Sequence, residues 1–130
     1  MSQRPAPTVR LFADFDGTVS PTDIGDALLR RFCGERMYHT ILADWRAGRL
    51  TAPQCYQRLF NAIPTLTEAA LAEFLASFEI DASFARFAAW CERSGYPLTI
   101  LSDGFDAYIE PLLRRAGVEV EYRANRLRLT

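Results

Sequence analysis

Residues 8–18, with the sequence TVRLFADFDGT, place an apolar stretch directly before two aspartates and a glycine. A buried parallel strand that ends in a tight glycine turn presents Asp14 and Asp16 together at its carboxyl end, where open α/β sheets bind their ligands. Two carboxylates held this close repel each other unless a cation lies between them. Because oxygen ligands with room for water suit Mg²⁺, the pair predicts a site for a metal ion and a phosphate group.

The composition indicates a globular domain with one core. The chain has 130 residues, of which 49% are apolar and 24% charged, with a formal net charge of −1. All fifteen basic residues are arginine, and they are spread over the expected helices and strand edges, so we predict no nucleic-acid binding. No long apolar stretch follows the amino-terminal charges, so we expect no secretory signal, no membrane span and a cytoplasmic location.

The cysteines and the single histidine exclude several kinds of site. Cys33, Cys55 and Cys91 are odd in number and lack CxxC spacing, which argues against a disulfide framework and against a zinc site. His39 lies in a stretch with helical spacing, beside Tyr38 and Ile41. We therefore expect it to have a structural or surface role rather than to belong to a catalytic triad.

Helical spacing of apolar residues replaces the strand pattern through residues 21–78. Four helices are expected there, with starts at Thr22 or Asp23, near Met37, after Thr51 and after Thr67, and with stops at Gly34, Gly48 and Pro64. A fifth helix is expected from Asp81 or Ser83 to Gly95.

A second strand is expected over residues 97–101, ending at Ser102 and followed by a glycine turn and a helix in which Pro111 marks a bend or a late first turn. Beyond Gly117, alternating apolar residues predict a further strand and then half of a β-hairpin up to the last residue.

Two apolar strands, each followed by a helix, predict an α/β fold with a doubly wound, Rossmann-like parallel sheet. We assign residues 1–19 and 80–130 to this core and residues 20–79 to a helical cap inserted after the first strand. The insertion is longer than an ordinary crossover, so we expect it to act as a lid. Neighbouring parallel strands would bring the aspartate pair and the Ser102 hydroxyl to one ligand.

The sequence DFDGT at residues 14–18, together with Ser102 after the apolar residues 98–101, resembles the first and second motifs of the haloacid dehalogenase-like hydrolases, most of which are magnesium-dependent phosphatases. A helical insertion between these motifs resembles the phosphoserine phosphatase-type subgroup. The stretches FDGTVSPTDIGDALL, DWRAGRLTAPQC and LSDGFDAYIEPLLRRAG are most similar to the methionine-salvage diketo-methylthiopentyl phosphate phosphatase branch. The resemblance covers nearly the whole chain, strongly at the two motifs and loosely through the cap.

Carboxylates in this arrangement can hydrolyse a phosphate ester in two steps. Asp14 can attack phosphorus to form an aspartyl-phosphate. Asp16 can protonate the leaving oxygen and then activate water as a carboxylate. The resemblance implies the same roles, with Asp14 as nucleophile and metal ligand and with Asp16 as acid and base, its main-chain carbonyl on the Mg²⁺ ion; it also implies that Thr18 supports the loop.

Phosphate binding is expected at the end of the second strand. The Ser102 hydroxyl and the backbone amides of Asp103 and Gly104 can form a cradle for phosphoryl oxygens, because a strand-to-helix turn directs N–H groups at an anion. Many relatives have a second glycine where Asp103 stands. In the cap, the large or polar residues that we expect to contact a small phosphorylated metabolite are Asp23, Trp45, Arg49 and Arg58.

The chain lacks two features that the resemblance leads one to expect. A third motif would supply a lysine and a fourth would supply one or two further aspartates, but the sequence contains no lysine and no such aspartate segment. Arg123, Arg126 and Arg128 are poor substitutes, because a guanidinium does not mimic a compact ammonium. The resemblance implies that the strand bearing the fourth motif lies beside the strand of residues 9–13, so its absence would make the sheet incomplete at the C-terminus and leave residues 9–13 as an exposed apolar edge. We therefore expect either a longer gene product or low stability and self-association through that edge.

Three functions remain as hypotheses. The favoured one is a magnesium-dependent phosphatase, represented by an incomplete catalytic core, that acts on a small phosphorylated metabolite. The alternative is a non-catalytic remnant that binds phosphate or metal weakly. A signalling receiver domain is disfavoured, because its alternating strands and helices do not fit the helical block over residues 21–78.

Overall fold

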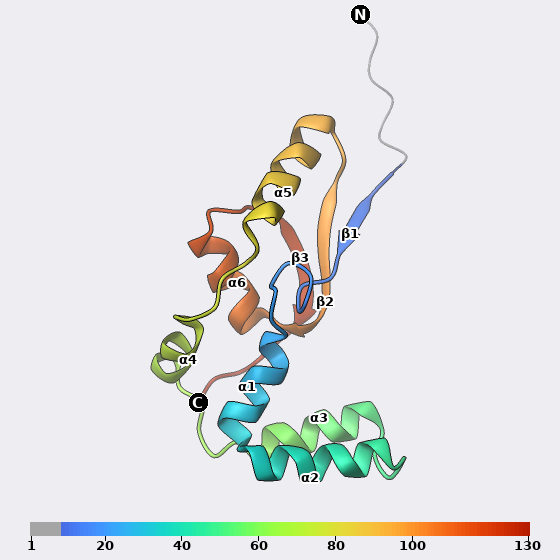
Figure 1. Cartoon of the computed structure of the whole chain (residues 1–130), viewed down its shortest axis with the longest axis vertical. Helices are drawn as coiled ribbons and strands as arrows, with labels where there is room; N and C mark the ends of the chain where they lie inside the picture. Colours follow the sequence, from blue (N-terminus) through green and yellow to red (C-terminus); the bar gives the residue numbers. More distant parts are fainter. Residues whose placement is uncertain (1–8) are drawn as a thin grey trace, which may run out of the picture. The chain divides into compact units, whose positions relative to one another are not determined.

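The structure is a computed structural model that describes residues 9–130. Figure 1 shows its nine elements, which are β1 (Leu11–Ala13), α1 (Ile24–Cys33), α2 (Glu35–Arg46), α3 (Ala52–Asn61), α4 (Glu68–Leu75), α5 (Ala82–Ser94), β2 (Leu98–Phe105), α6 (Asp106–Arg115) and β3 (Glu121–Asn125).

The chain forms two compact units. The α/β unit comprises the described residues up to Asp23 together with Ser77–Leu127, and the helical unit comprises Ile24–Ala76 together with Arg128–Thr130. The assignment of residues 20–79 to a lid over the remainder stays a prediction, and the assigned residues 1–8 lie outside the part that the structure describes.

The three strands form one parallel sheet in the order β1-β2-β3. Ala13 pairs with Ile100 on β2, and Ile100 pairs with Tyr122 on β3. The prediction of an α/β fold with a parallel sheet is confirmed. In the sheet of the described residues, β1 lies at one edge. Self-association through this edge stays a prediction.

Strand β2 is longer than the predicted residues 97–101, because it continues to Phe105. Pairing with β3 is interrupted after Leu101, which is opposite Arg123, and resumes at Phe105, which is opposite Asn125. Three residues of β2 therefore face a single residue of β3, an irregularity of the kind that often re-aims side chains beside a functional site.

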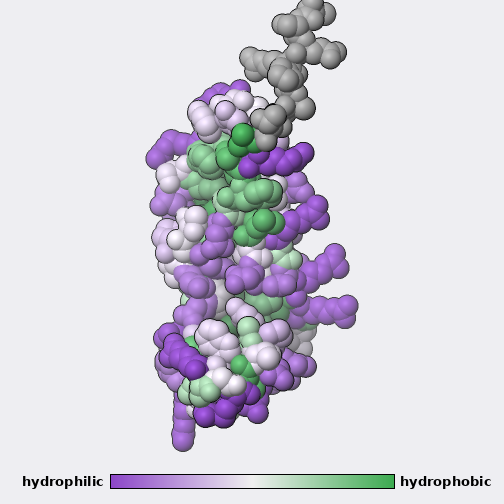
Figure 2. Space-filling view, turned by 90° about the vertical axis from the view of Figure 1, so that its right-hand side faces the viewer, coloured by the Kyte–Doolittle hydropathy of each residue, from purple (hydrophilic) through white to green (hydrophobic). Residues whose placement is uncertain are grey.

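One face of the sheet is covered by α5 and α6, which lie on the same side of the strands in Figure 1. The core on this side includes Ile100, Cys91 and Leu112, all at most 1% exposed. On the opposite face, Phe12 is 60% exposed and Leu101 is 47% exposed. Figure 2 shows apolar surface gathered on the side of the molecule that it presents to the viewer.

The helix boundaries follow the predicted caps. Thr51 accepts a hydrogen bond from the Gln54 amide and donates its own amide to the Gln54 side chain, forming a capping box at the start of α3. Asp81 caps α5, and Gly95 ends it with a left-handed φ of 75°. The predicted positions of these three boundaries are confirmed. Pro111 is the sixth of the ten residues of α6, so the predicted alternative of a late first turn is wrong.

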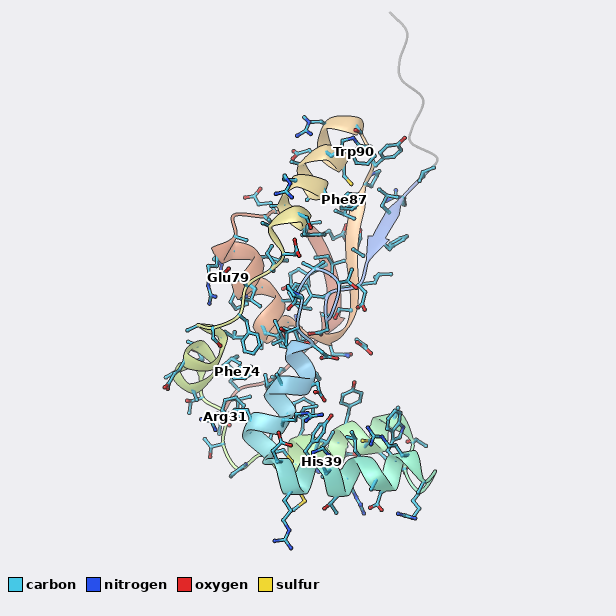
Figure 3. The ribbon with its side chains drawn as sticks, in the orientation of Figure 1. Arg31, His39, Phe74, Glu79, Phe87 and Trp90 are labelled. Carbon is cyan, nitrogen blue, oxygen red and sulfur yellow. The ribbon has the colours of Figure 1, made fainter. Side chains whose placement is uncertain are left out.

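The helical unit has its own core, formed by buried residues of α1, α2 and α3: Leu29, Tyr38, Ile41, Cys55 and Leu59. His39 lies on α2 (Figure 3) and its imidazole is 3.0 Å from the Glu35 carboxylate at the surface. Cys33, Cys55 and Cys91 are free thiols. The exposed position of His39 agrees with the surface role predicted for it.

The predicted half-hairpin at the C-terminus is wrong. Residues 126–130 form no strand in the structure. The Leu127 amide instead donates to the Asp106 carboxylate, and Thr130 exchanges hydrogen bonds with Leu66. The backbone amides of Leu127 and Thr130 therefore bind a side chain and a loop carbonyl, instead of the partner strand of the expected hairpin.

Two segments of the α/β unit, one before and one after the helical unit in the chain, are joined by a hydrogen bond. The amide of Asp81, just before α5, donates to the carbonyl of Val19 at 2.8 Å. Val19 and Ser20 are fully buried, and the Ser20 hydroxyl donates to the Thr22 carbonyl.

Within residues 9–130 no helix combines the length and apolarity that crossing a membrane requires.

Candidate active site

The segment after β1 folds into a closed turn around Phe15. Its carbonyl accepts hydrogen bonds from the amides of Thr18 and Ser20, at 3.1 and 3.0 Å, and Gly17 adopts a φ of 77°, which favours glycine. Phe15 is fully buried. Because the aromatic ring anchors the turn in the core, the aspartates on either side of it are held at the end of the strand.

Asp14 and Asp16 have different surroundings. Asp14 is exposed, and its Oδ1 accepts a hydrogen bond from the Phe15 amide at 2.8 Å. Asp16 is half-buried, and its Oδ2 accepts a hydrogen bond from the Tyr108 hydroxyl at 2.5 Å. The first aspartate is thus open to solvent, whereas the second is tied to α6.

Gly104 lies directly against the Asp16 carboxylate. A Cβ atom at Gly104 would be 2.6 Å from Asp16 Oδ2 and would overlap the Tyr108 hydroxyl. The end of β1 and the irregular part of β2 therefore meet, as sequence reasoning expected from neighbouring parallel strands. Only a residue without a side chain fits at this contact.

Tyr108 is fully buried at the centre of this contact. Burial raises the pKa of its phenol strongly, and the hydrogen bond to Asp16 and the charge of Asp16 raise it further, against the opposing effect of a hydrogen bond with the Phe105 backbone. At neutral pH the phenol therefore stays protonated and donates its hydrogen bond to Asp16.

The predicted phosphate cradle is organised by internal hydrogen bonds. The Gly104 amide donates to the Ser102 hydroxyl oxygen at 2.9 Å, and the Asp103 carbonyl accepts from the Asn125 side chain at 2.8 Å. Ser102 is half-buried and Asp103 is exposed. Ser102, Asp103 and Gly104 were expected to form a turn between the second strand and the following helix. They instead belong to the irregular end of β2, and Phe105 occupies the N-cap position of α6.

The described residues contain no group of three or more histidine, cysteine or acidic side chains placed to hold a metal ion. The oxygen donors at the end of β1 include the carboxylates of Asp14, which is exposed, and of Asp16, which is half-buried. These hard ligands fit Mg²⁺, which is usually bound through one or two carboxylates and retains several waters.

The residues predicted to contact a substrate fall in both units. Asp23 belongs to the α/β unit, is exposed, and contributes through its charge to the raised pKa of Tyr108. In the helical unit, Arg49 and Arg58 both donate to the carboxylate of Asp44, at 2.9 and 3.2 Å. The nearby Trp45 is 44% exposed. Asp44 therefore partly neutralises the two cationic side chains.

Sequence reasoning missed two residues of this region, Tyr108 and Asn125. Tyr108 is 92 positions away from Asp16 in the chain, and in the sequence it reads as one more core residue of a helix. Asn125 follows an alternating strand and resembles an ordinary turn residue. The one available signal was Gly104, whose lack of a side chain indicates a close approach by another group.

Comparisons with known proteins agree with this architecture. The family model described as haloacid dehalogenase-like hydrolase matches residues 11–130. A 2-hydroxy-3-keto-5-methylthiopentenyl-1-phosphate phosphatase of Geobacillus kaustophilus is 30% identical over 104 residues, which are 79% of this chain and 47% of that protein. A phosphatase of the same name from Microcystis aeruginosa is 28% identical, over 83% of this chain and 51% of its own length. The chain thus spans about half the length of the curated relatives it matches.

Solved structures show the same fold at low sequence identity. A haloacid dehalogenase-family hydrolase from Salmonella enterica superposes with a TM-score of 0.77 at 18% identity, covering 97% of this chain and 43% of that one. A substrate-bound phosphoserine phosphatase superposes with a TM-score of 0.69 at 18% identity, covering 95% of this chain and 60% of that one.

Proposed function

Because this chain belongs to the haloacid dehalogenase-like hydrolase family, we propose that its α/β unit carries the aspartate site of a magnesium-dependent phosphatase. The observation that carries the proposal is the meeting of Asp16 with Gly104, at the ends of β1 and β2. This contact brings the two segments that bear the predicted reacting and phosphate-binding groups to one place.

In the proposed reaction, a carboxylate oxygen of Asp14 attacks the phosphorus atom of a phosphate monoester. The bond from phosphorus to the leaving oxygen breaks, and that oxygen takes a proton from Asp16. In the second step Asp16, now a carboxylate, takes a proton from water while the water oxygen attacks the aspartyl-phosphate, which releases inorganic phosphate and regenerates Asp14. The exposure of Asp14 supports its assignment as the attacking group.

Mg²⁺ is proposed at the Asp14 carboxylate and the Asp16 main-chain carbonyl. When bound, it would neutralise charge on the carboxylate and on the phosphoryl oxygens. Ser102 and the amides of Asp103 and Gly104 are proposed to bind those oxygens. For the Gly104 amide this means exchanging its present acceptor, the Ser102 hydroxyl oxygen, for a phosphoryl oxygen.

The proposed substrate is a small phosphorylated metabolite, in agreement with the names of the relatives, which are phosphatases of 2-hydroxy-3-keto-5-methylthiopentenyl-1-phosphate. Asp23, Arg49 and Arg58 are proposed to contact the part of the substrate that does not react. Because Arg49 and Arg58 bind Asp44, an anionic group would have to compete with that carboxylate for them.

The test is magnesium-dependent release of inorganic phosphate from 2-hydroxy-3-keto-5-methylthiopentenyl-1-phosphate by the chain and by its Asp14→Asn variant. We expect the variant to lose activity by a factor of at least about 10³, the scale on which nucleophile removal acts. Asp81→Asn makes the same chemical change at a helix cap, where asparagine serves as well as aspartate, and is expected to keep the parent rate. Equal background rates for the parent and Asp14→Asn would refute catalysis and favour a protein that only binds phosphate or metal.

A further inference from the structure

The hydroxyl of Tyr108, on α6, donates a hydrogen bond of 2.5 Å to Asp16 Oδ2 in the aspartate turn after β1. We propose that Tyr108 is a positioning residue, which holds the Asp16 carboxylate in one orientation for proton transfer. The proposal rests on the function proposed above for Asp16, and it assigns a role in that function to a residue outside the recognised motifs.

The aromatic ring of Tyr108 is held beside Asp16 by its packing. The ring is fully buried and is packed against Phe15, at a centroid distance of 6.0 Å, and against Phe105, at 6.4 Å with an edge-on angle of 73°. Both phenylalanines belong to the segments that carry the site. The position of the hydroxyl is therefore fixed by the same packing that fixes the two loops.

Gly104 adds a steric argument. The space beside its α-carbon is occupied by the Tyr108 hydroxyl and the Asp16 carboxylate, so the glycine makes room for this pair as well as for a phosphate. Gly104 and Tyr108 are four residues apart, across the start of α6. The lack of a side chain at Gly104 thus allows the Tyr108 hydroxyl to reach Asp16.

Positioning matters for Asp16 because its proposed task is proton transfer in two successive steps. A half-buried aspartate can populate several rotamers, and the donor or acceptor must lie within hydrogen-bonding reach of the reacting oxygen. A displacement of about 1 Å can lower a rate about 10²-fold. Removal of the Tyr108 hydroxyl should therefore slow turnover through Asp16 while leaving substrate binding unchanged.

The kinetic test compares Tyr108→Phe, Asp16→Asn and the double variant with the parent chain. We expect Tyr108→Phe to lower kcat by about 10- to 100-fold with KM unchanged within a factor of about two. In the Asp16→Asn background, the same change should have no further effect, because the group that Tyr108 positions is already absent. An equal drop in both backgrounds is what a merely structural role would produce, and it would overturn the proposal.

Tyr122→Phe is the matched control. Its hydroxyl is 3.4 Å from the Glu110 carboxylate at the surface, so this variant removes a tyrosine-to-carboxylate contact that lies outside the site. It should leave kcat at the parent value, which separates loss of the Asp16 contact from a general effect of deleting a phenol.

Urea unfolding of the parent chain, Tyr108→Phe, Asp16→Asn and the double variant gives a measurement that does not depend on catalysis. Residues in one hydrogen-bonded pair couple in a double-mutant cycle, so we expect the unfolding equilibrium constant to show a coupling of at least about tenfold between Tyr108 and Asp16. Coupling without Asp14-dependent turnover would refute the proposed function and uphold the contact that holds Asp16. A coupling below about twofold would refute the inference whether or not the chain turns over.

Discussion

The contact at Gly104 predicts a large cost for a small substitution, Gly104→Ala. The added methyl carbon would overlap the Tyr108 hydroxyl, and it would lie 2.6 Å from Asp16 Oδ2 and 2.9 Å from Tyr108 Cζ. Atoms do not approach this closely, so the tyrosine, the aspartate or the strand must move. The backbone itself does not resist the change, because Gly104 is outside the positive-φ region that excludes alanine.

The magnitude follows from three contributions. Inserting a methyl group into a packed site typically costs about 1–3 kcal/mol, and displacing the hydroxyl forfeits a hydrogen bond to a charged group, about 1.5–3 kcal/mol. Alanine recovers about 0.4–1 kcal/mol by restricting the unfolded chain. The free energy of unfolding should therefore fall by about 2–5 kcal/mol, a large part of the stability of a domain of this size.

The assay is urea unfolding followed by far-UV circular dichroism, with Gly104→Ala measured in the parent and in a Tyr108→Phe background. The second background lacks both the overlapping oxygen and the hydrogen bond, so the alanine should cost less there by at least about 1.5 kcal/mol. A cost below about 0.5 kcal/mol in the parent, or the same cost in both backgrounds, would refute the view that Gly104 is required by the tyrosine and the aspartate.

Two further predictions concern stability. Thr51→Ala removes the capping box at the start of α3 and should lower the free energy of unfolding by about 1 kcal/mol, measured by urea unfolding against Thr65→Ala at an exposed site outside the helices; an unchanged midpoint would contradict the cap assignment. At high pH, the raised pKa of Tyr108 means that its contribution is fully present below the unfolded value of about 10 and is lost as the pH rises above it. The urea midpoint should fall above about pH 10, and the fall should be shallower in Tyr108→Phe, because that variant lacks the phenol whose ionisation the folded state opposes. An identical fall in the two proteins would contradict this prediction.

The elements that sequence predicted well are those whose boundaries are set locally. Thr51, Asp81 and Gly95 mark helix ends through interactions with backbone groups one to four residues away, and such signals are legible without knowing the fold. The apolar stretches before Asp14 and Ser102 also identified β1 and the first half of β2. The parallel sheet followed from the order of strands and helices.

The elements that sequence missed depend on partners far away in the chain. Strand β2 continues past Ser102 because Phe105 pairs with Asn125, and no local pattern announces that pairing. The expected final hairpin strand is absent from the described residues because Leu127 donates to the Asp106 side chain. In the candidate site, Asp14 and Asp16 were identified from their spacing, whereas Tyr108 was not, because its contact with Asp16 depends on how α6 is rotated against the sheet.

The hydrogen bond between the Asp81 amide and the Val19 carbonyl has a consequence for how such a protein can change over evolutionary time. These two backbone groups flank residues 20–80 and already touch, so the loop between them is closed whatever its length. Each doubling of a flexible loop costs only about 0.6 kcal/mol of closure entropy. Segments of different size and sequence could therefore be exchanged between these two groups without changing the register of the strands.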